Sequence, residues 1–340
     1  MTRTVLFDEL GGPEVLRLAD VEVGDPGPGE VRLRVDAIGV NRAEALFRSG
    51  HYIEPVRRFP ARLGTEAAGE IEAVGPGVPG LRPGDPVSVV PAFSQNDYGV
   101  YADRAIVPAA AVLPRPAGTD AVTGAAVWMP YVTAYGALLE VGGLRPGDAV
   151  VLNAASSSVG LAAVHVADRI GTLPVALTRS AAKREALLKE GAAEVIVTGP
   201  GVTAAEIAER VRAATGGRGA RIVLDAVAGP GMTDLARLVA DEGTLMVVGA
   251  LSGEPTPYPG IELGMPALNV RTYTMHETTR RPERLRRAAA FVTSGLRSGA
   301  FRPVVDRTFE LAEVAEAHRY LDAHAHIGKI VLTVDRGPVS

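Results

Sequence analysis

The sequence predicts an α/β fold in two parts, an antiparallel β region followed by a parallel sheet that helices cover on both faces. Two observations lead to this prediction. Up to about residue 120, the 340-residue chain is dense in glycine and proline, and short strand-like runs lie between turn signals. From Asp148 onward, apolar strands alternate with helical segments, a pattern typical of parallel βα units.

Alternating runs define the strands expected in the first region. Residues 30–40 and 67–75 alternate apolar and polar side chains between glycine- and proline-rich turns. The pattern changes near Thr119, where a long helical segment opens over residues 119–144 with Thr119 or Asp120 as its N-cap. This change marks the expected end of the first region.

Strands and helices alternate up to about residue 251, and after Gly253 this order breaks down. The expected strands are 148–154, 172–178, 194–198, 220–227, 244–251, 269–277 and 328–334. The expected helices are 158–171, 180–192, 203–217, 229–243, 282–299 and 311–325. Repeated βα units of this kind imply a parallel sheet.

The composition limits the partners and the chemistry. A net charge of −4 gives no reason to expect nucleic acid or an acidic membrane surface as a partner. The chain has no cysteine, which excludes disulfides, thiolate catalysis and cysteine-ligated zinc. Its N-terminus is not typical of a signal peptide, and no apolar run is long enough to span a bilayer. We therefore expect a soluble, cytoplasmic protein that acts on a small-molecule substrate.

The turn after the first strand of the βα series is a candidate phosphate-binding site. Residues 150–167 read VVLNAASSSVGLAAVHVA, a strand followed by a turn of small residues and a helix. Three glycines are expected in a dinucleotide-binding turn; here Ala155 and Ser157 replace the first two, and Gly160 retains the third. Serine hydroxyls add donors to the amides at the positive end of the helix. We predict cofactor contacts from Ser156, Ser157, Ser158, Val159 and Gly160; the alternative is a helix that serine merely caps.

The end of the next strand indicates which dinucleotide binds. NAD sites place Asp or Glu there to hold the ribose 2′-hydroxyl. This chain has Thr178, Arg179 and Ser180 at that place, and Lys183 follows one turn later. Arginine, serine and lysine bind a 2′-phosphate that a carboxylate would repel. The sequence therefore predicts NADPH; the alternative is that Arg179 and Lys183 are solvated charges at the start of a helix.

Several stretches resemble the medium-chain dehydrogenase/reductase superfamily over nearly the whole chain. They are GVNRAEALFRSGHY (39–52), LGTEAAGEIEAVGPGV (63–78), LRPGDPV (81–87), TAYGALLEVGGLRPGDAVVL (133–152), the serine turn, LDAVAG (224–229) and the closing GKIVLTV. Within the superfamily, the chain looks most like the zinc-free quinone oxidoreductase and enoyl reductase branches.

The resemblance implies a GroES-like β domain and a Rossmann domain with a doubly wound parallel sheet, with the active site in the cleft between them. Residues 1–120 would form the first part of the GroES-like catalytic domain and 121–268 the NADPH-binding domain. Residues 269–340 would form the edge strand of the Rossmann sheet and the return to the catalytic domain. The resemblance also places further residues at the cofactor, namely Ala226, Val227, Gly249, Ala250, Leu251 and Lys329.

Two positions depart from the zinc enzymes of the superfamily. Asn41 stands where those enzymes place a ligand cysteine, and Thr65 replaces the histidine of their GHE motif. His324 and His326 have a spacing that suits surface residues better than shared metal ligation. We therefore predict no metal, and hydride transfer from the nicotinamide to an activated C=C bond of a quinone or an α,β-unsaturated carbonyl.

Three residues are candidates for catalysis because they match positions of the family. Asn41 resembles the asparagine beside the nicotinamide, Thr133 a threonine near it, and Tyr52 a tyrosine proposed as proton donor in some polyketide enoyl reductases. Each has a structural alternative: a turn-stabilising asparagine, a threonine that packs a helix, and a tyrosine that packs in the core.

The large side chains just before Thr133 have two interpretations. Trp128, Met129 and Tyr131 either line a substrate pocket or belong to the core. The loop 91–104, with Tyr98 and Tyr101, is a candidate lid.

Two other functions stay open. One is a zinc-free carbonyl or alcohol oxidoreductase with the same cofactor, and the other is a redox-silent NADPH-binding biosynthetic enzyme such as a cyclase. The alternating strand at 269–277 predicts a homodimer, because pairing this edge with its copy removes an exposed strand edge.

Overall fold

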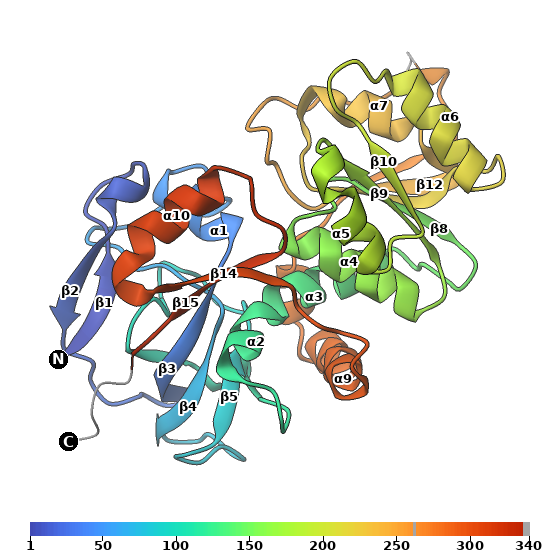
Figure 1. Ribbon diagram of the computed structural model, residues 1–340. Helices are drawn as coiled ribbons and strands as arrows, with labels where there is room; N and C mark the ends of the chain where they lie inside the picture. The colour runs from blue at the N-terminus through green and yellow to red at the C-terminus, as the bar shows by residue number, and fades with distance from the viewer. Residues whose placement is uncertain (261–262, 336–340) are drawn as a thin grey trace. The chain divides into compact units, whose positions relative to one another are not determined.

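The computed structural model describes residues 1–260 and 263–335, and it divides the chain into two compact units (Figure 1). The first unit consists of Met1–Met129 and Arg302–Ser340, and the second of Pro130–Phe301. The first unit therefore extends past residue 120, where the sequence placed the boundary. α2 (Ala121–Ala126) belongs to the first unit, and the side chain of its N-cap, Asp120, accepts a hydrogen bond from the Thr123 amide.

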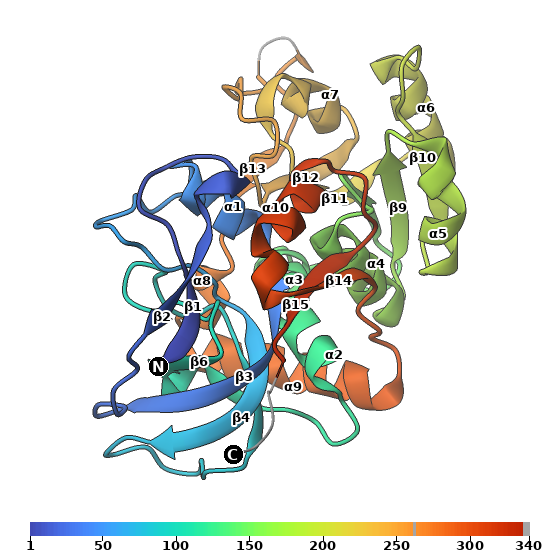
Figure 2. The same cartoon turned by 60° about the vertical axis from the view of Figure 1, so that its left-hand side comes forward.

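The seven-stranded sheet of the first unit is built around β3 (Glu30–Val40). Alternate residues are buried in the first part of β3, as expected for a strand with one face on a core, and its last four residues are all buried. The other strands are β4 (Ala67–Val74), β5 (Pro86–Val89), β6 (Arg104–Pro108), β7 (Val112–Pro114), β14 (Val305–Glu310) and β15 (Lys329–Thr333). The order is β14-β15-β3-β4-β5-β7, and β6 also pairs with β3. Figure 2 shows β3 and β4 side by side, paired antiparallel.

Short elements complete the first unit. They are β1 (Thr2–Leu6) and β2 (Arg17–Val21), which pair antiparallel, α1 (Arg42–Arg48), α10 (Val314–Asp322), and 3₁₀ turns at Pro13–Val15, Ala109–Ala111 and Leu311–Glu313. Small buried side chains let α2 approach the sheet closely: Ala125 and Ala126 pack with Ala37, Ala68 and Val331. The two ends of the chain thus share one core.

The second unit holds a six-stranded parallel sheet. Its strands are β8 (Ala149–Leu152), β9 (Leu173–Thr178), β10 (Glu194–Val197), β11 (Ala220–Asp225), β12 (Val239–Val247) and β13 (Asn269–Thr272). The order is β10-β9-β8-β11-β12-β13, and every pair is parallel. The first strand of this unit, β8, lies in the middle of the sheet. The chain adds β9 and β10 on one side and then returns to add β11, β12 and β13 on the other, as in a doubly wound fold.

Helices precede, connect and follow the parallel strands. They are α3 (Trp128–Tyr135), which continues as a π-helical turn over Gly136–Val141, α4 (Ser158–Arg169), α5 (Arg184–Lys189), α6 (Ala204–Ala214), α7 (Met232–Ala236), α8 (His276–Thr279) and α9 (Pro282–Ser298). A 3₁₀ turn at Ala181–Lys183 precedes α5, and another at Gly229–Gly231 precedes α7. Buried side chains of α6 and α7 join those of β8 and β11 in one core cluster.

Three segments differ from the sequence-based expectation. The single helix expected over 119–144 is divided into α2, α3 and the π-helical turn Gly136–Val141. The helix expected over 229–243 ends at Ala236, and β12 begins already at Val239, because the backbone of Val239 pairs with Ala220 of β11. The strand expected over 269–277 is formed over Asn269–Thr272 and gives way to a short helix at His276.

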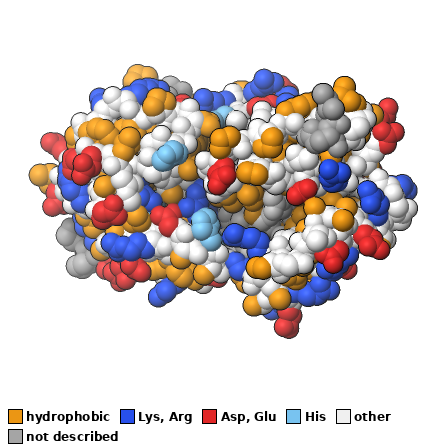
Figure 3. All heavy atoms as spheres, turned by 90° about the horizontal axis from the view of Figure 1, so that it is seen from above, with side chains coloured by type: hydrophobic (Ala, Val, Ile, Leu, Met, Phe, Trp, Pro, Cys, Tyr) orange, Lys and Arg blue, Asp and Glu red, His pale blue; other side chains and the backbone are white. Residues whose placement is uncertain are grey.

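Two features of the structure concern the membrane and nucleic-acid partners that the sequence gives no reason to expect. No helix in the described part of the chain is long and apolar enough to cross a membrane. On the face seen in Figure 3, Lys and Arg side chains are interspersed with Asp and Glu.

Candidate active site

The serine turn joins the C-terminal end of β8 to α4. Ser157 is the N-cap of α4, and its Oγ accepts a hydrogen bond from the Gly160 amide at 3.1 Å. A Cβ on Gly160 would lie 2.5 Å from the carbonyl oxygen of Ala155, so the close approach of helix and turn requires glycine here. Ser157 therefore caps the helix, and Gly160 keeps the packing role expected of the third glycine. The first amides of α4 have no partner within the helix and can bind an anion.

Side chains from the neighbouring strands stabilise this turn. Ala154 has a positive φ of 51°, and its amide donates to Oδ1 of Asn153 at 2.8 Å. Nδ2 of Asn153 donates to Oδ1 of Asp225 at 3.0 Å, and the same carboxylate oxygen accepts from the amides of Val227 and Ala228. One buried carboxylate at the end of β11 thus organises two loops at the same edge of the sheet.

The loops after β11 and β12 are joined by backbone hydrogen bonds. Leu251 donates its amide to the carbonyl oxygen of Ala226 at 3.2 Å, and a Cβ on Gly249 would lie 2.7 Å from that oxygen. The structure therefore brings Ala226, Val227, Gly249, Ala250 and Leu251 to the edge that carries the serine turn. Their contact with a cofactor stays a prediction.

The end of β9 presents basic and hydroxyl groups. Nζ of Lys183 donates to Oγ of Ser156 at 3.3 Å, so this lysine lies against the serine turn. Oγ1 of Thr178 accepts from the Ser180 amide at 3.3 Å. Arg179 is exposed to solvent. These groups lie where an adenosine ribose and its 2′-phosphate bind in folds of this type.

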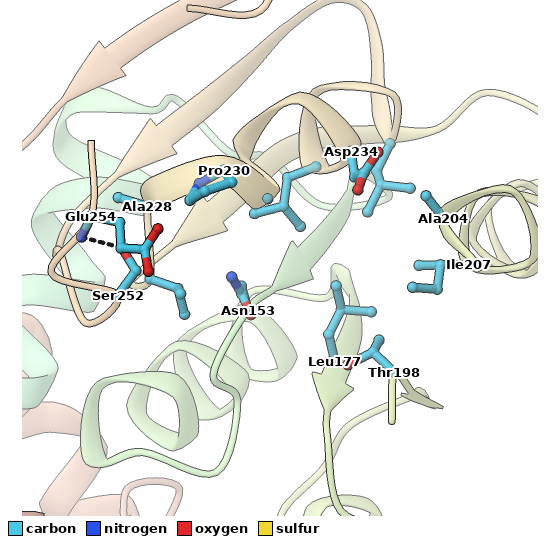
Figure 4. Close-up of a pocket in the computed structure, with 14 residues that line it drawn as sticks. Asn153, Leu177, Thr198, Ala204, Ile207, Ala228, Pro230, Asp234, Ser252 and Glu254 are labelled. Carbon is cyan, nitrogen blue, oxygen red and sulfur yellow. Dashed lines mark hydrogen bonds between the residues drawn. The ribbon is translucent and has the colours of Figure 1, made fainter. Parts of the chain in front are cut away.

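A pocket of about 370 Å³ opens at the same edge of the sheet (Figure 4). Asn153 and Leu177 line it from the ends of β8 and β9, and Thr198 lies just beyond β10. Ser252 and Glu254 line another side, where Oγ of Ser252 accepts from the Glu254 amide at 3.3 Å (Figure 4). None of these five residues is among the sites predicted from the sequence, although their positions at or after the ends of parallel strands were a usable signal.

Asn41 lies in the first unit, between β3 and α1, and is buried. It is the N-cap of α1 in a capping box with Glu44, whose Oε2 accepts from the Asn41 amide at 2.9 Å. Nδ2 of Asn41 donates to the carbonyl oxygen of Gly39 at 3.2 Å, and its Oδ1 accepts from Nζ of Lys329. Asn41 therefore stabilises the turn and also has its side-chain amide held in a fixed orientation.

Lys329 and Glu66 form a buried ion pair beside Asn41. Lys329 is 1% exposed and Glu66 0%, and Nζ of Lys329 lies 2.7 Å from Oε2 of Glu66. Oε1 of Glu66 accepts from the Met129 amide at 2.8 Å. The structure thus places Lys329 in the first unit, against Asn41 and Glu66, and its predicted contact with the cofactor remains untested.

Glu44 is a second buried carboxylate in this cluster. Its Oε1 accepts from Oγ1 of Thr65 at 3.0 Å, and Thr65 is also buried. Burial raises the pKa of Glu44 to about 7, against the opposing effects of Lys329 and of its hydrogen bonds. The cluster holds two carboxylates and one ammonium, so protonation of Glu44, which its raised pKa favours, brings the net charge of the cluster to zero.

The remaining candidates lie apart in the chain. Tyr52, in the first unit, is half-buried, and its ring contacts Phe47 edge-on with centroids 6.2 Å apart. Thr133 is buried in α3, whose residues Pro130–Tyr135 belong to the second unit. Trp128, Met129 and Tyr131 are buried, and so is Tyr101 of the candidate lid.

Among residues 1–260 and 263–335, no group of three or more His, Asp or Glu side chains is arranged to hold a metal ion. His324 contributes its Nδ1 to a contact with the Arg42 guanidinium at 3.3 Å.

Comparisons with known proteins agree with this architecture. Residues 27–117 match the alcohol dehydrogenase GroES-like domain, and residues 190–332 match a family model described as zinc-binding dehydrogenase. A quinone oxidoreductase of Pseudomonas aeruginosa is 32% identical over 98% of this chain and 99% of its own. A 2-haloacrylate reductase of Burkholderia sp is 30% identical over 98% and 99%.

Solved structures give the same result. The structure of Escherichia coli quinone oxidoreductase complexed with NADPH matches with a TM-score of 0.89 and 28% identity, over 97% of this chain and 99% of that one. These relatives therefore match both units of the chain over nearly its full length. The chain belongs to the medium-chain dehydrogenase/reductase superfamily, in its quinone oxidoreductase-like branch.

Proposed function

We propose that this protein transfers a hydride from NADPH to the activated C=C bond of a quinone or an α,β-unsaturated carbonyl, without a metal ion. It is an NADPH-dependent oxidoreductase, as its quinone oxidoreductase and 2-haloacrylate reductase relatives and the NADPH-bound structure of the Escherichia coli enzyme indicate. The choice of a C=C bond rests on the names of these relatives, because a quinone and an acrylate both carry a double bond conjugated to an electron-accepting oxygen.

The residues of the second unit fit the cofactor. The amides at the start of α4 and the hydroxyls of Ser156 and Ser158 can hold the pyrophosphate. Arg179 and Lys183 can hold the 2′-phosphate, because guanidinium and ammonium groups form charge-assisted hydrogen bonds with phosphate. When bound, NADPH supplies the hydride through its nicotinamide.

The Lys329–Glu66 contact is the observation that carries the metal-free proposal. Nζ of Lys329 donates to both Glu66 and Asn41, so the chain itself supplies the cation that the carboxylate of Glu66 pairs with. A zinc ion needs neutral or anionic donor atoms, and an ammonium next to the same carboxylate is not one. Asn41 and Thr65 therefore act as hydrogen-bonding groups.

The proton that completes the reaction comes from a residue of the chain or from water. Reduction places the hydride on the β-carbon, moves the π electrons to the carbonyl oxygen and leaves an enolate, which takes a proton at the α-carbon. The phenol of Tyr52 is the proposed donor for that proton. Asn41 and Thr133 are proposed to position the reacting groups.

Stoichiometric NADPH oxidation tests this function. The substrates are 1,4-benzoquinone, 2-cyclohexenone and 2-chloroacrylate, with benzaldehyde as the carbonyl without a conjugated aliphatic double bond. With NADPH deuterated at the transferred position, we expect deuterium at the β-carbon of cyclohexenone. Deuterium at the carbonyl carbon, or turnover of benzaldehyde alone, would identify a carbonyl reductase, and binding of NADPH without consumption would identify a redox-silent enzyme.

A metal analysis completes the test. Activity should survive dialysis against a chelator, and elemental analysis should find zinc well below one per chain. Stoichiometric zinc with loss of activity on its removal would contradict the metal-free proposal.

We also propose a homodimer that pairs β13 with its copy, and a cytoplasmic location remains an expectation from the sequence. β13 is the edge of the six-stranded sheet, and three of its four residues are exposed. An uncovered edge strand is an aggregation hazard that a closed two-fold pairing removes. Light scattering at micromolar concentration should give twice the chain mass of 35.3 kDa; the mass of a monomer would contradict the proposal.

A further inference from the structure

A second cavity lies entirely within the first unit. It has a volume of about 530 Å³ and is formed by the β1–β2 pair, the segment 58–62 and the loop 95–98. Leu6, Val21 and Phe59 contribute apolar surface to its lining. We call it the arginine groove, after Arg58 and Arg62, which line it as well.

The two arginines of the groove are exposed to solvent, and no described residue is paired with them. Within the described part of the chain, neither Arg58 nor Arg62 makes an ion pair or a hydrogen bond. The neighbouring Arg57 behaves differently, because its guanidinium is paired with Oδ1 of Asp97 at 2.9 Å. Burial, and then the charge of Arg58, lower the pKa of Arg62. The groove therefore carries positive charge that the protein leaves uncompensated.

Gln95 adds a third donor. It lines the groove, is 3% exposed, and its Oε1 accepts from the Gly64 amide at 3.0 Å. Since the carbonyl oxygen must face that amide, the orientation of the side chain is fixed, and Nε2 is a donor. Nε2 is buried and has no hydrogen-bond partner among the described residues. A buried donor without a partner is rare and calls for an occupant.

The other polar groups of the groove are already engaged. Oδ1 of Asn96 accepts from the Arg57 amide at 2.8 Å, and its Nδ2 donates to the carbonyl oxygen of Pro55 at 3.0 Å. The hydroxyl of Tyr98 donates to Glu30 at 2.7 Å. The carboxylate of Asp97 is the one acidic group in the lining and is held by Arg57. Among the side chains that line the groove, the polar groups that remain available are hydrogen-bond donors.

We propose that the arginine groove binds a small organic anion, whose carboxylate or phosphate oxygens accept hydrogen bonds from Arg58, Arg62 and Nε2 of Gln95. Guanidinium groups bind both oxyanions with charge-assisted hydrogen bonds. The apolar body of the ligand rests on Leu6, Val21 and Phe59, which distinguishes it from a free inorganic ion. The site goes beyond the proposed hydride transfer, because it shares no residue with the candidate active site.

Calorimetric titration of the full chain at low ionic strength tests the proposal. The probes are benzoate and phenyl phosphate, and benzyl alcohol is the neutral control of the same shape. Saturating NADPH is present throughout, so that the phosphate-binding turn of the second unit is filled. We expect at least one of the two anions to bind with a stoichiometry of one per chain, and benzyl alcohol to give no saturable heat.

Substitutions place the binding in the groove. Arg62→Gln should weaken the anion at least tenfold. Gln95→Glu keeps the acceptor for Gly64 but replaces the donor by a negative oxygen, and should abolish binding, with the thermal midpoint recorded to confirm folding. Arg57→Gln, a matched charge removal in the same segment, should change the affinity less than twofold. The proposal is overturned if neither anion saturates, if binding survives Arg62→Gln unchanged, or if Arg57→Gln weakens it as much.

Discussion

Lys329 donates a hydrogen bond from its Nζ to Oδ1 of Asn41, although 288 positions separate the two residues in the chain. The same ammonium donates to Oε2 of Glu66 at 2.7 Å. Because a lysine ammonium has donors alone, this contact fixes which end of the Asn41 amide faces β15 and turns Nδ2 toward the carbonyl oxygen of Gly39. The orientation of a candidate catalytic side chain is thus set by the last strand of the fold.

Replacing Lys329 by methionine tests this relationship. The change leaves the buried carboxylate of Glu66 unpaired, which costs about 3–5 kcal/mol of unfolding free energy. It also releases the amide of Asn41, so we expect kcat to fall at least tenfold, about 1.4 kcal/mol of transition-state stabilisation. Urea unfolding and NADPH oxidation measure the two effects separately.

A double variant separates orientation from stability. In Lys329→Met with Glu66→Gln no buried charge is left unpaired, and the glutamine keeps an oxygen for the Met129 amide. Unfolding free energy should therefore recover by several kcal/mol, as expected for removal of both partners of a buried pair. Activity should stay low, because nothing replaces the donor to Oδ1. If kcat recovers together with stability, Lys329 has a structural role alone.

The serine turn was predictable from the sequence because its information is local. A strand, small residues and a helix follow within 18 positions. In the structure Ser157 caps α4 and Gly160 lets helix and turn approach closely, and contact of the turn with a cofactor stays a prediction. The cluster of Lys329, Glu66 and Asn41 was not predictable in this way, because partners 263 and 288 positions apart meet through sheet pairing. Likewise, the residues after Leu238 have a helical pattern, and pairing with β11 makes them a strand.

Glu44 should make stability fall as the pH rises. Its pKa is 4.5 in the unfolded chain and about 7 in the fold, where burial favours the neutral acid. The folded state therefore binds more protons between pH 4.5 and 7, and stability is lost as the pH rises through this range, by about 3 kcal/mol in total. Glu44→Gln should abolish this component, measured as the difference between wild-type and variant urea unfolding at pH 5, 6, 7 and 8.

The measured quantity is the difference in unfolding free energy between wild type and Glu44→Gln, because His318 makes stability change with pH in the opposite direction. This histidine is fully buried, and burial, together with the charges of Arg48 and Arg42, lowers its pKa from 6.5 to about 3. Its contribution is present above pH 6.5 and is lost as the pH falls toward 3. It is common to wild type and Glu44→Gln, so it cancels in the difference. Parallel stability curves for the two proteins would show that Glu44 titrates normally.

Arg179 should account for much of the preference for NADPH. Because no carboxylate stands at Thr178–Ser180, we expect NADPH to bind at least tenfold more tightly than NADH, about 1.4 kcal/mol. Arg179→Ala should erode this ratio by weakening NADPH while leaving NADH unchanged. Fluorescence titration of both nucleotides measures it. Arg184→Ala is the matched control, because that guanidinium donates to the carbonyl oxygen of Val195, and its loss should leave the ratio intact.

Tyr52→Phe tests the proposed proton donor. The edge-on contact of the ring with Phe47 survives the change, so the fold should be unaffected. If the phenol supplies the proton, kcat should fall roughly 100-fold, within the range of general acid catalysis. NADPH affinity should barely change, since the predicted site for its phosphates is the serine turn of the second unit.

The size of this loss decides between the phenol and water. Solvent can protonate an enolate once it has formed, so a loss below about threefold would remove Tyr52 from the mechanism without contradicting reduction of the C=C bond. Tyr320→Phe is the matched control: it deletes a hydroxyl that donates to Asp306 on the surface, and kcat should stay at the wild-type value. A solvent deuterium isotope effect on kcat that is present in wild type and altered in Tyr52→Phe would place the phenolic proton in the rate-limiting step. An unaltered isotope effect would assign the proton to water.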